Sequence, residues 1–392
     1  MVRKTILVNI LLVVILMLIS IARPALAQTS DITGHWASAQ INNWLEKGLI
    51  RGYEDDSFKP DNNMSRAEFV AVLNRALGLT AKTKVVFSDV SANAWYADNV
   101  EKAQAAAYIS GYEDNTFRPD NLITRVEVAK ILSAVLKLKN YEDSTQLNGY
   151  QDAGNIPQWG KESLNSAIVE KYFQGYPDNT IRPINHISRA EAVTVLYQAM
   201  GTVYNAAGVY GPEKDATAIK GNVTVSSAGV NIRNTKIEGN LILAAGIGDG
   251  NVELDNVIVT GRTVINGGGA HSIIIRNSHL NEVLVNKYFG ETPRIAAEGR
   301  SVVGNVTLES PASLEENKLA GKGFDVLKVS PWFSGNSVLQ LAGDFQVYID
   351  AKADIELLNG KITMETSAQA AGTIINVLKE ATIANFISGA SA

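Results

Sequence analysis

Residues 52–69 read GYEDDSFKPDNNMSRAEF, and related stretches follow at 111–128 (GYEDNTFRPDNLITRVEV) and 175–192 (GYPDNTIRPINHISRAEA). Each copy has a Gly-Tyr pair, a proline, and then a Ser or Thr followed directly by arginine. The copies recur at similar intervals along the chain. Self-similarity of this kind indicates a repeat array, in which one supersecondary unit is copied and stacked.

The end of each copy predicts an amphipathic helix. Residues 128–136 and 192–200 place apolar side chains at i, i+3, i+4, i+7 and i+8, as expected for one face of a helix. The first copy has the same spacing, with Phe69, Val72, Leu73, Ala76 and Leu77.

A capping box begins each of these helices: SRAE at 65–68, TRVE at 124–127 and SRAE at 188–191. The hydroxyl of the first residue accepts from the helix backbone, and the glutamate reaches back to the N-cap N–H. A unit of about 50 residues with two short helices has a thin core, so we expect the three units to pack as one body.

Helix initiation does not explain the arginine inside each capping box. At the first helical position its charge lies beside the positive end of the helix dipole, which is mildly unfavourable. Its recurrence suggests that an anion meets it, since a guanidinium beside unpaired helix N–H groups can bind a carboxylate or phosphate. An internal ion pair with an aspartate of the preceding loop is an equally good explanation. The arginines are Arg66, Arg125 and Arg189, and the loop aspartates are Asp55, Asp114 and Asp178.

A tryptophan is expected to open the first helix of each unit. Trp36, Trp95 and Trp159 keep the same two intervals as the repeat arginines. A tryptophan at such a position either anchors the core or lies partly exposed, where its flat face suits the apolar side of a sugar ring. The polar context of the sequence WYAD at 95–98 keeps the second interpretation open.

Taken together, these motifs resemble the S-layer homology (SLH) domain family over about residues 29–200. The resemblance implies a helical, three-pronged pseudo-trimer whose grooves bind a cell-wall polysaccharide, often one that carries ketal-linked pyruvate. It implies non-covalent anchoring rather than catalysis. Pyruvate is a carboxylate, which agrees with the anion pocket suggested by the arginines. The binding residues implied are the three arginines with Trp36, Trp95, Trp159, Asp31, Asp89, Asp152, Gly52, Gly111 and Gly175.

The loops depart from the family pattern at the position where a second glycine is common. Asp56, Asn115 and Asn179 stand there, and these residue types tolerate the left-handed conformation better than most. We therefore expect the turn to be kept. The spacing from Asp152 to Trp159 is two residues longer than that from Asp31 to Trp36, so the third site departs furthest from the common pattern.

The N-terminal segment, residues 1–27, is typical of an export signal. A basic start precedes an apolar run at 6–21, and Ala25-Leu26-Ala27 is a small-x-small cleavage site. The apolar run is shorter than the roughly 20 residues that a membrane span needs, so we expect cleavage near Ala27 and no transmembrane segment afterwards.

Charge and cysteine content limit the partners of the exported chain. Cleavage removes three of the 35 basic residues, leaving 32 against 40 acidic residues and a net charge of −8. This balance argues against nucleic acid as a general partner. The chain has no cysteine, so it has no disulfides, no lipid attachment through cysteine and no thiolate metal site.

The pattern changes after Gly201. Residues 202–218 suggest a short linker, and short β-prone segments follow from Ile219. Glycine recurs at Gly239 and Gly261, and asparagine recurs with nearly the same period at Asn234, Asn256 and Asn277. This rung-length period predicts a parallel right-handed β-helix, or solenoid, with asparagines stacked at its corners. An antiparallel β-sandwich is the alternative.

The β-domain has no recognisable catalytic signature. Asp249, Glu253 and Asp255 are scattered rather than clustered, and His271 and His279 are expected to face solvent. We expect no metal, no cofactor and no enzymatic activity, although the pattern of residues 219–392 leaves the last point open. The competing hypothesis is a wall-anchored lyase or hydrolase, for which a β-helix is a common scaffold. An outer-membrane protein is disfavoured, because no long series of ten-residue membrane strands is present.

The sequence therefore predicts a secreted bacterial surface protein, held on wall polysaccharide and displaying a structural solenoid that could self-associate as in an S-layer. Its expected parts are a signal peptide (1–27), SLH repeats (28–80, 84–140 and 147–201), a linker (202–218) and a β-helix-like domain (219–392).

Overall fold

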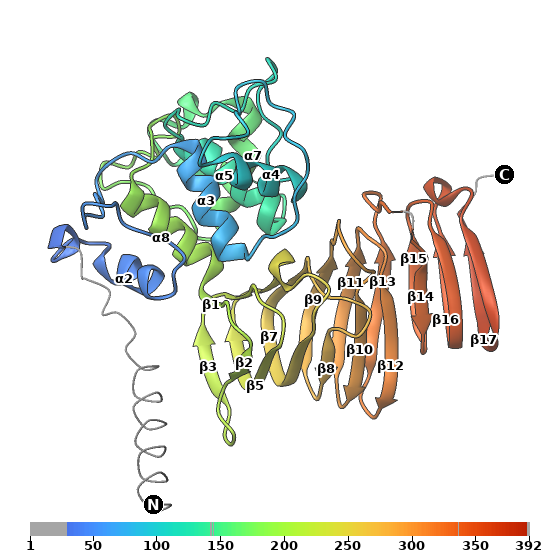
Figure 1. Ribbon diagram of the computed structural model, residues 1–392. Helices are drawn as coiled ribbons and strands as arrows, with labels where there is room; N and C mark the ends of the chain where they lie inside the picture. Colours follow the sequence, from blue (N-terminus) through green and yellow to red (C-terminus); the bar gives the residue numbers. More distant parts are fainter. Residues whose placement is uncertain (1–29, 142, 144, 336, 390–392) are drawn as a thin grey trace, which may run out of the picture.

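The computed structural model describes residues 30–141, 143, 145–335 and 337–389. The expected signal peptide lies outside these residues. The chain forms a helical body followed by a β-solenoid, and the helical body lies near the N-terminal end of the solenoid (Figure 1).

Each repeat supplies two principal helices. Those that begin with a capping box are α3 (Arg66–Leu77), α5 (Arg125–Leu136) and α8 (Arg189–Met200). Both bonds of all three capping boxes are present, which confirms the predicted helix starts. The first helices and shorter elements are η1 (Ser30–Ile32), α2 (Ser38–Glu46), α4 (Ala97–Ala105), α6 (Thr145–Asn148), η2 (Ala153–Asn155) and α7 (Gln158–Val169).

The three repeats close into a ring. Helix α3 packs on α4 of the second repeat, α5 on α7 of the third, and α8 returns to α2 of the first. Backbone hydrogen bonds follow the same cycle, from Ile123 N to Met64 O, Ile187 N to Ile123 O and Met64 N to Ile187 O, each 3.0 Å long. One hydrophobic cluster runs through all three repeats, as expected for units too small to be stable alone.

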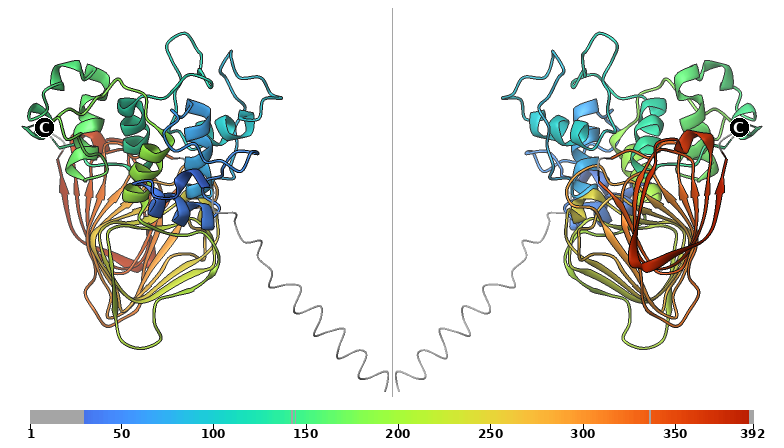
Figure 2. Two further views of the ribbon diagram at one scale, coloured as in Figure 1. Left: turned by 90° about the vertical axis from the view of Figure 1, so that its left-hand side faces the viewer. Right: turned by 90° about the vertical axis from the view of Figure 1, so that its right-hand side faces the viewer.

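The second body is a parallel solenoid. All pairings between its strands are parallel, which excludes the antiparallel sandwich. Figure 2, which looks along the solenoid, shows strands wound about a common axis with the helices on one side. The strands, with the short helices η3 (Ala245–Ile247) and η4 (Ala368–Ala370), are β1 (Thr202–Tyr204), β2 (Gly208–Tyr210), β3 (Thr217–Lys220), β4 (Val223–Val225), β5 (Val230–Glu238), β6 (Leu241–Leu243), β7 (Val252–Ile265), β8 (Ile274–Arg276), β9 (His279–Val285), β10 (Arg294–Gly299), β11 (Val302–Leu308), β12 (Ser313–Leu319), β13 (Gly323–Val329), β14 (Leu339–Ala342), β15 (Phe345–Ile349), β16 (Asp354–Thr366) and β17 (Ile374–Ser388).

Inward-facing apolar side chains stack from one solenoid turn to the next. Ile232 pairs in register with Leu254, and Leu254 with Ile275; all three are fully buried. Because successive residues of a strand alternate between the two faces, this register fixes which side chains fill the core.

The predicted corner asparagines are present. Asn234, Asn256 and Asn277 have φ values of 47°, 55° and 49°, in the left-handed region that asparagine tolerates better than most residues. Asn256 Nδ2 donates to Asn234 Oδ1 at 2.8 Å, which is the expected stacking between turns. Asn277 differs in that its Oδ1 accepts from the backbone N–H of Arg300.

The suggested linker at 202–218 contains the first turn of the solenoid. Strand β1 pairs with β4 and β2 with β5, so the chain enters the solenoid directly after α8. The helical core also continues into the solenoid through Val203, Ile242 and Ala244. The linker interpretation rested on the Gly- and Ala-rich composition, which does not reveal that these short segments pair with strands farther along.

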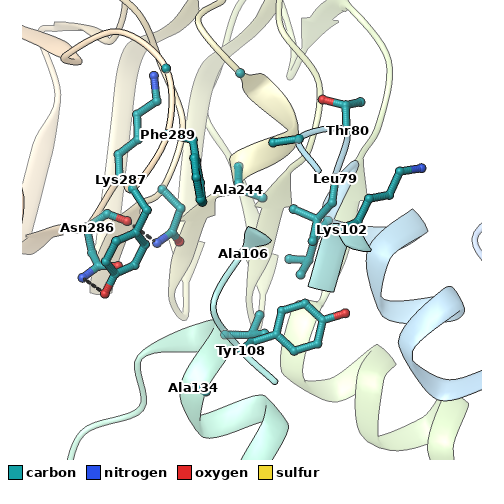
Figure 3. A pocket seen from close by; sticks show the side chains of 18 of the residues that line it. Leu79, Thr80, Lys102, Ala106, Tyr108, Ala134, Ala244, Asn286, Lys287 and Phe289 are labelled. Atoms are coloured by element: carbon teal, nitrogen blue, oxygen red, sulfur yellow. Dashed lines mark hydrogen bonds between the residues drawn. The ribbon is translucent and has the colours of Figure 1, made fainter. Parts of the chain in front are cut away.

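A cavity of about 300 Å³ lies between the helical body and the solenoid. Figure 3 shows Leu79 and Tyr108 on the helical side and Ala244 and Phe289 on the solenoid side. The two bodies are also tied by polar contacts. Lys139 forms an ion pair with Glu282 at 2.6 Å, and Lys137 Nζ donates to Tyr288 Oη.

Candidate functional site

The three repeat tryptophans lie on the surface. Trp36, Trp95 and Trp159 are 61%, 61% and 54% exposed, whereas Trp44 is fully buried in the helical core. The interpretation of the repeat tryptophans as core anchors is therefore wrong. Each presents a large aromatic face to solvent beside the start of a first helix.

The three repeat arginines are buried and link each repeat to the next. Their Nε atoms donate at 2.9 Å to backbone carbonyls of the following repeat in the cycle: Arg66 to Phe117, Arg125 to Ile181 and Arg189 to Phe58. Their exposed fractions are 7%, 4% and 4%.

Each arginine also faces the capping-box glutamate of the following repeat in the cycle. Arg66 is 3.0 Å from Glu127, and the equivalent pairs Arg125–Glu191 and Arg189–Glu68 are each 3.6 Å apart. The arginines therefore form internal ion pairs, although not with the loop aspartates considered from the sequence. Those aspartates pair within their own loops, as Asp55–Lys59, Asp114–Arg118 and Asp178–Arg182.

The helix N-termini are not open anion sites. The backbone N–H of Arg66 donates to Asn121 O, and that of Ala67 to Pro119 O, at 2.9 and 3.0 Å. The other two capping-box helices repeat both bonds, onto Asn185 and Pro183 and onto Asn62 and Pro60. The expectation of unpaired helix N–H groups is therefore wrong, because the next repeat satisfies them.

The aspartates ahead of the first helices hold the Gly-Tyr loops in shape. Asp89 accepts from the backbone N–H groups of Phe117 and Arg118, both at 2.7 Å. Arg118 has a φ of 56°, so these bonds stabilise a left-handed residue. Asp31 and Asp152 make the same contacts with Phe58 and Lys59, and with Ile181 and Arg182. A direct role of these aspartates in ligand binding stays a prediction.

Two of the three predicted loop glycines, Gly111 and Gly175, have a steric reason to be present. A Cβ at Gly111 would lie 2.3 Å from the Phe87 ring, and one at Gly175 would lie 2.2 Å from the Tyr150 ring. The residues that replace the family's second glycine behave as expected. Asp56, Asn115 and Asn179 have φ values of 59°, 60° and 57°.

One groove brings several of the predicted residues together. It has a volume of about 700 Å³, and we call it groove 1. All three repeats contribute, since Gly52 and Tyr53 come from the first, Trp95 from the second and Arg189 from the third. The full lining is Ile50, Arg51, Gly52, Tyr53, Glu54, Asp55, Glu68, Ala71, Val72, Arg75, Trp95 and Arg189.

Because the three repeats close into a ring, the arginine–tyrosine contact of groove 1 has an equivalent at each of the other two repeat junctions. The Arg189 guanidinium lies 4.6 Å from the centre of the Tyr53 ring in groove 1. At the two equivalent junctions of the ring, which we name groove 2 and groove 3 after their place in the repeat cycle, Arg66 lies 4.8 Å from the Tyr112 ring and Arg125 lies 4.8 Å from the Tyr176 ring. By the order of the repeat copies, the tryptophan equivalent to Trp95 is Trp159 for groove 2 and Trp36 for groove 3.

A tyrosine–glutamate hydrogen bond lies at the base of each groove. Tyr53 donates to Glu68 at 3.2 Å and Tyr112 to Glu127 at 2.5 Å, and Tyr176 makes the same bond with Glu191. Burial and the adjacent glutamate raise the pKa of Tyr112 and of Tyr176 to about 12. Burial alone would raise the pKa of Glu127, but the bonds from Tyr112 and Thr124 and the Arg66 charge lower it overall.

Comparison with known families identifies this helical body. The model of the S-layer homology domain matches residues 28–70, 86–129 and 149–193. The chain carries three S-layer homology domains. The resemblance seen in the sequence is confirmed, and each match ends inside the helix that a capping box begins.

Curated relatives share this module in different contexts. The chain is 32% identical to Cell surface glycoprotein 1 of Acetivibrio thermocellus over 39% of its length, and 31% identical to an amylopullulanase of Thermoanaerobacterium thermosulfurigenes over 43%. It is 30% identical to the Surface-layer 125 kDa protein of Lysinibacillus sphaericus over 45%. The matches span only 7%, 9% and 15% of these relatives. The SLH domains and these relatives indicate a secreted protein anchored to the cell wall.

Two features of the grooves were not identified as site residues from the sequence. The tyrosine of each Gly-Tyr loop and the capping-box glutamate together contact the arginine of the preceding repeat in the ring. The sequence contained a signal for both residues, because both recur in all three copies.

Within the described residues, no helix is long and apolar enough to cross a membrane.

Proposed function

We propose that the three SLH domains hold this protein on a cell-wall polysaccharide whose sugars lie in the grooves between repeats. The observation that carries the proposal is the lining of groove 1. An exposed tryptophan and an arginine from different repeats lie along one hollow large enough for one or two sugar rings. The tryptophan offers an apolar face, and the positive charge of the guanidinium attracts an acidic group on the sugar.

An acidic substituent such as a ketal-linked pyruvate fits this arrangement. The guanidinium of Arg189 already donates to two backbone carbonyls, of Phe58 and Arg51, and lies near one carboxylate. Its attraction for the ligand is therefore mainly electrostatic. In a half-enclosed groove such an attraction is screened less than on an open surface.

The solenoid is proposed to be structural, as a spacer or an S-layer-like part of the cell surface. Many of its charges form pairs between turns, as in Arg276–Glu298 at 3.1 Å and Lys328–Asp350 at 2.9 Å. Asp249, one of the scattered acids, pairs with Lys287. Within the described residues, no group of three or more His, Asp or Glu side chains is placed to hold a metal ion.

The test is co-sedimentation of the chain from Gln28 onward with purified cell-wall sacculi. Trp36, Trp95 and Trp159 are replaced together by alanine. The matched control is Trp332→Ala, since Trp332 is 78% exposed on the solenoid and lies outside the grooves. We expect the triple variant to stay in the supernatant and Trp332→Ala to sediment like the unchanged protein.

A second arm uses sacculi from which acid has removed the secondary polymer. Loss of binding on these sacculi supports polysaccharide as the receptor. Sedimentation of the triple variant with intact sacculi, or of the unchanged protein with stripped sacculi, would contradict the proposal. Tryptophan is a suitable site for this test because its exposed side chain can be truncated without removing core packing.

A further inference from the structure

The three grooves differ in charge although they share one plan. Alignment of the repeat sequences places Arg51 of groove 1 at the position of Ser110 and Gln174, and Arg75 at the position of Ala134 and Gln198. Both arginines line groove 1 together with Arg189. Groove 1 therefore has an arginine at all three of these positions. Groove 2 and groove 3 each have an arginine at one of them.

The three guanidinium-bearing residues lie close together. Arg189 donates to the backbone carbonyl of Arg51 at 2.9 Å, and Arg75 donates through Nε to the carbonyl of Leu49 at 3.0 Å. Burial and the nearby charges of Arg51 and Arg189 lower the pKa of Arg75. Like charges gathered in this way cost free energy unless an anion offsets them.

Of the three guanidiniums, Arg189 has a carboxylate partner, Glu68 at 3.6 Å. Asp55 pairs with Lys59 at 2.9 Å, and Glu68 accepts from the backbone N–H of Ser65 and from Tyr53. Glu54 also lines groove 1, but its equivalent in groove 2 is Glu113, so it does not set the two grooves apart. Among the described residues, Arg51 and Arg75 form no ion pair with a carboxylate.

The cation stacked on each groove tyrosine does not distinguish the grooves. Lys59 lies over Tyr53 in groove 1, and Arg118 and Arg182 lie over the equivalent tyrosines. In every groove this cation is paired with the aspartate of its own loop. Its charge is therefore already balanced by the protein.

The other grooves differ at a further position. Ala71 of groove 1 corresponds to Lys130 in groove 2 and to Thr194 in groove 3. Lys130 is exposed and adds one hydrated point charge, which does not reproduce the flat, forked donor array of a guanidinium. Groove 2 has Glu113 where groove 3 has Pro177, so Lys130 gives groove 2 no net gain in positive charge. We expect both grooves to bind an acidic ligand more weakly than groove 1.

We infer that groove 1 is the principal ligand site, and that it takes a polysaccharide unit bearing more than one negative charge, with Arg51 and Arg75 as the residues that select it. This inference rests on the proposed function. Arg189 has an equivalent arginine in each of the other two grooves. The positions of Arg51 and Arg75 are basic in groove 1 alone. Two acidic groups on one or two adjacent sugars match these neighbouring positive charges better than a single carboxylate does.

The test exchanges residues between grooves. Arg51→Ser gives groove 1 the residue of groove 2, and Arg75→Ala does the same at the second position. Arg51 is exposed, so Arg51→Ser leaves the core intact and keeps the test valid if Arg75→Ala lowers stability. The matched control is Arg300→Ser, which removes an exposed arginine of the solenoid outside the grooves. The probe is the acidic polysaccharide released from sacculi, titrated by calorimetry against each variant.

We expect Arg51→Ser to weaken the tightest binding step about tenfold and to reduce its dependence on salt, because a charge-assisted contact is lost. Arg300→Ser should leave that step unchanged. Polysaccharide whose acidic substituents have been removed should bind both groove 1 variants and the unchanged protein equally weakly.

Two results would overturn the inference. Arg51→Ser and Arg75→Ala could both leave the tightest step unchanged while the groove tryptophans remain necessary for wall binding. That outcome keeps the anchoring function and refutes the special role of groove 1. Alternatively, the unchanged protein could fail to bind the polysaccharide at all, which refutes both.

Discussion

Glu127 caps the helix that it helps to begin and, in the same position, lies 3.0 Å from Arg66 of the preceding repeat. One carboxylate therefore links a local event, helix initiation, to the closure of the three-repeat ring. Arg66 is buried by this arrangement and also donates to the carbonyl of Phe117. The recurring arginine is thus a structural residue of the ring, whatever it contributes to ligand attraction.

Replacement of Arg66 by alanine is expected to destabilise the helical body by about 3 kcal/mol, because it leaves the carbonyl of Phe117 without its donor and the largely buried Glu127 carboxylate without its cation. Urea unfolding followed by circular dichroism measures the loss. Arg51→Ala is the control, since Arg51 is an exposed arginine of the same repeat. Equal stability of the two variants would show that the ring ion pair contributes nothing. For the same reason, loss of wall binding in an Arg66 variant would not by itself identify a ligand contact.

Asp89→Ala is expected to destabilise the second repeat, since two backbone N–H groups, of Phe117 and Arg118, lose their acceptor. An unsatisfied buried donor costs about 1–3 kcal/mol. Asp89→Asn keeps one side-chain oxygen and should cost less. Thermal unfolding of both variants tests this order. If Asp89→Ala unfolds like the unchanged protein but binds the wall polymer more weakly, the aspartate is a ligand residue rather than a loop clamp.

At the solenoid corner, Asn256→Ala should be more damaging than Asn256→Gly. Both remove the 2.8 Å bond to Asn234, but only alanine is strained at a φ of 55°. The difference should be about 1 kcal/mol, the cost of the left-handed conformation for a residue with a Cβ. Denaturant unfolding of the two variants gives this difference directly. Equal midpoints would mean that the corner relaxes to another conformation.

Stability should fall as pH rises from about 10 to about 12. Tyr112 and Tyr176 have a folded pKa of about 12, raised from 10.0 by burial and by the neighbouring glutamates. In that window the unfolded chain releases the phenolic protons while the folded chain keeps them, so unfolding becomes more favourable. Urea midpoints measured from pH 8 upward, with tyrosinate absorbance as the second signal, test the window.

Tyr112→Phe should make this decline less steep, because one of the titrating groups is removed. The remaining decline belongs to Tyr176 and to the other tyrosines whose pKa is raised, such as Tyr53. An unchanged pH dependence in Tyr112→Phe would contradict the pKa assigned to that side chain.

The repeat pattern was sufficient to predict the helices and the solenoid, because both follow from periodic residues. The capping boxes fix the starts of α3, α5 and α8, and the rung-length period fixes which side chains stack, as in Asn234 and Asn256. The partner of Arg66 could not be predicted in this way. It depends on which repeat lies beside which in the ring, and no local pattern contains that information.

The environments of the tryptophans show the same limit. Trp36 and Trp44 are close in sequence, yet one is 61% exposed and the other fully buried. Sequence spacing places both near the first helix, but only the packing of α2 on α8 decides which side chain enters the core. The stretch 202–218 resembled a linker for a related reason, since strand pairing across long separations is invisible in a Gly-rich segment.

Anchoring through the grooves requires that the wall polymer lies against the groove tryptophans, and acrylamide quenching of tryptophan fluorescence tests this directly. Trp332→Phe leaves the three exposed groove tryptophans and the buried Trp44 as the fluorophores. Addition of the polysaccharide released from sacculi should shield the exposed indoles and lower the quenching constant. An unchanged quenching constant at saturating polysaccharide would contradict the account, because a ligand bound elsewhere leaves these rings open to solvent.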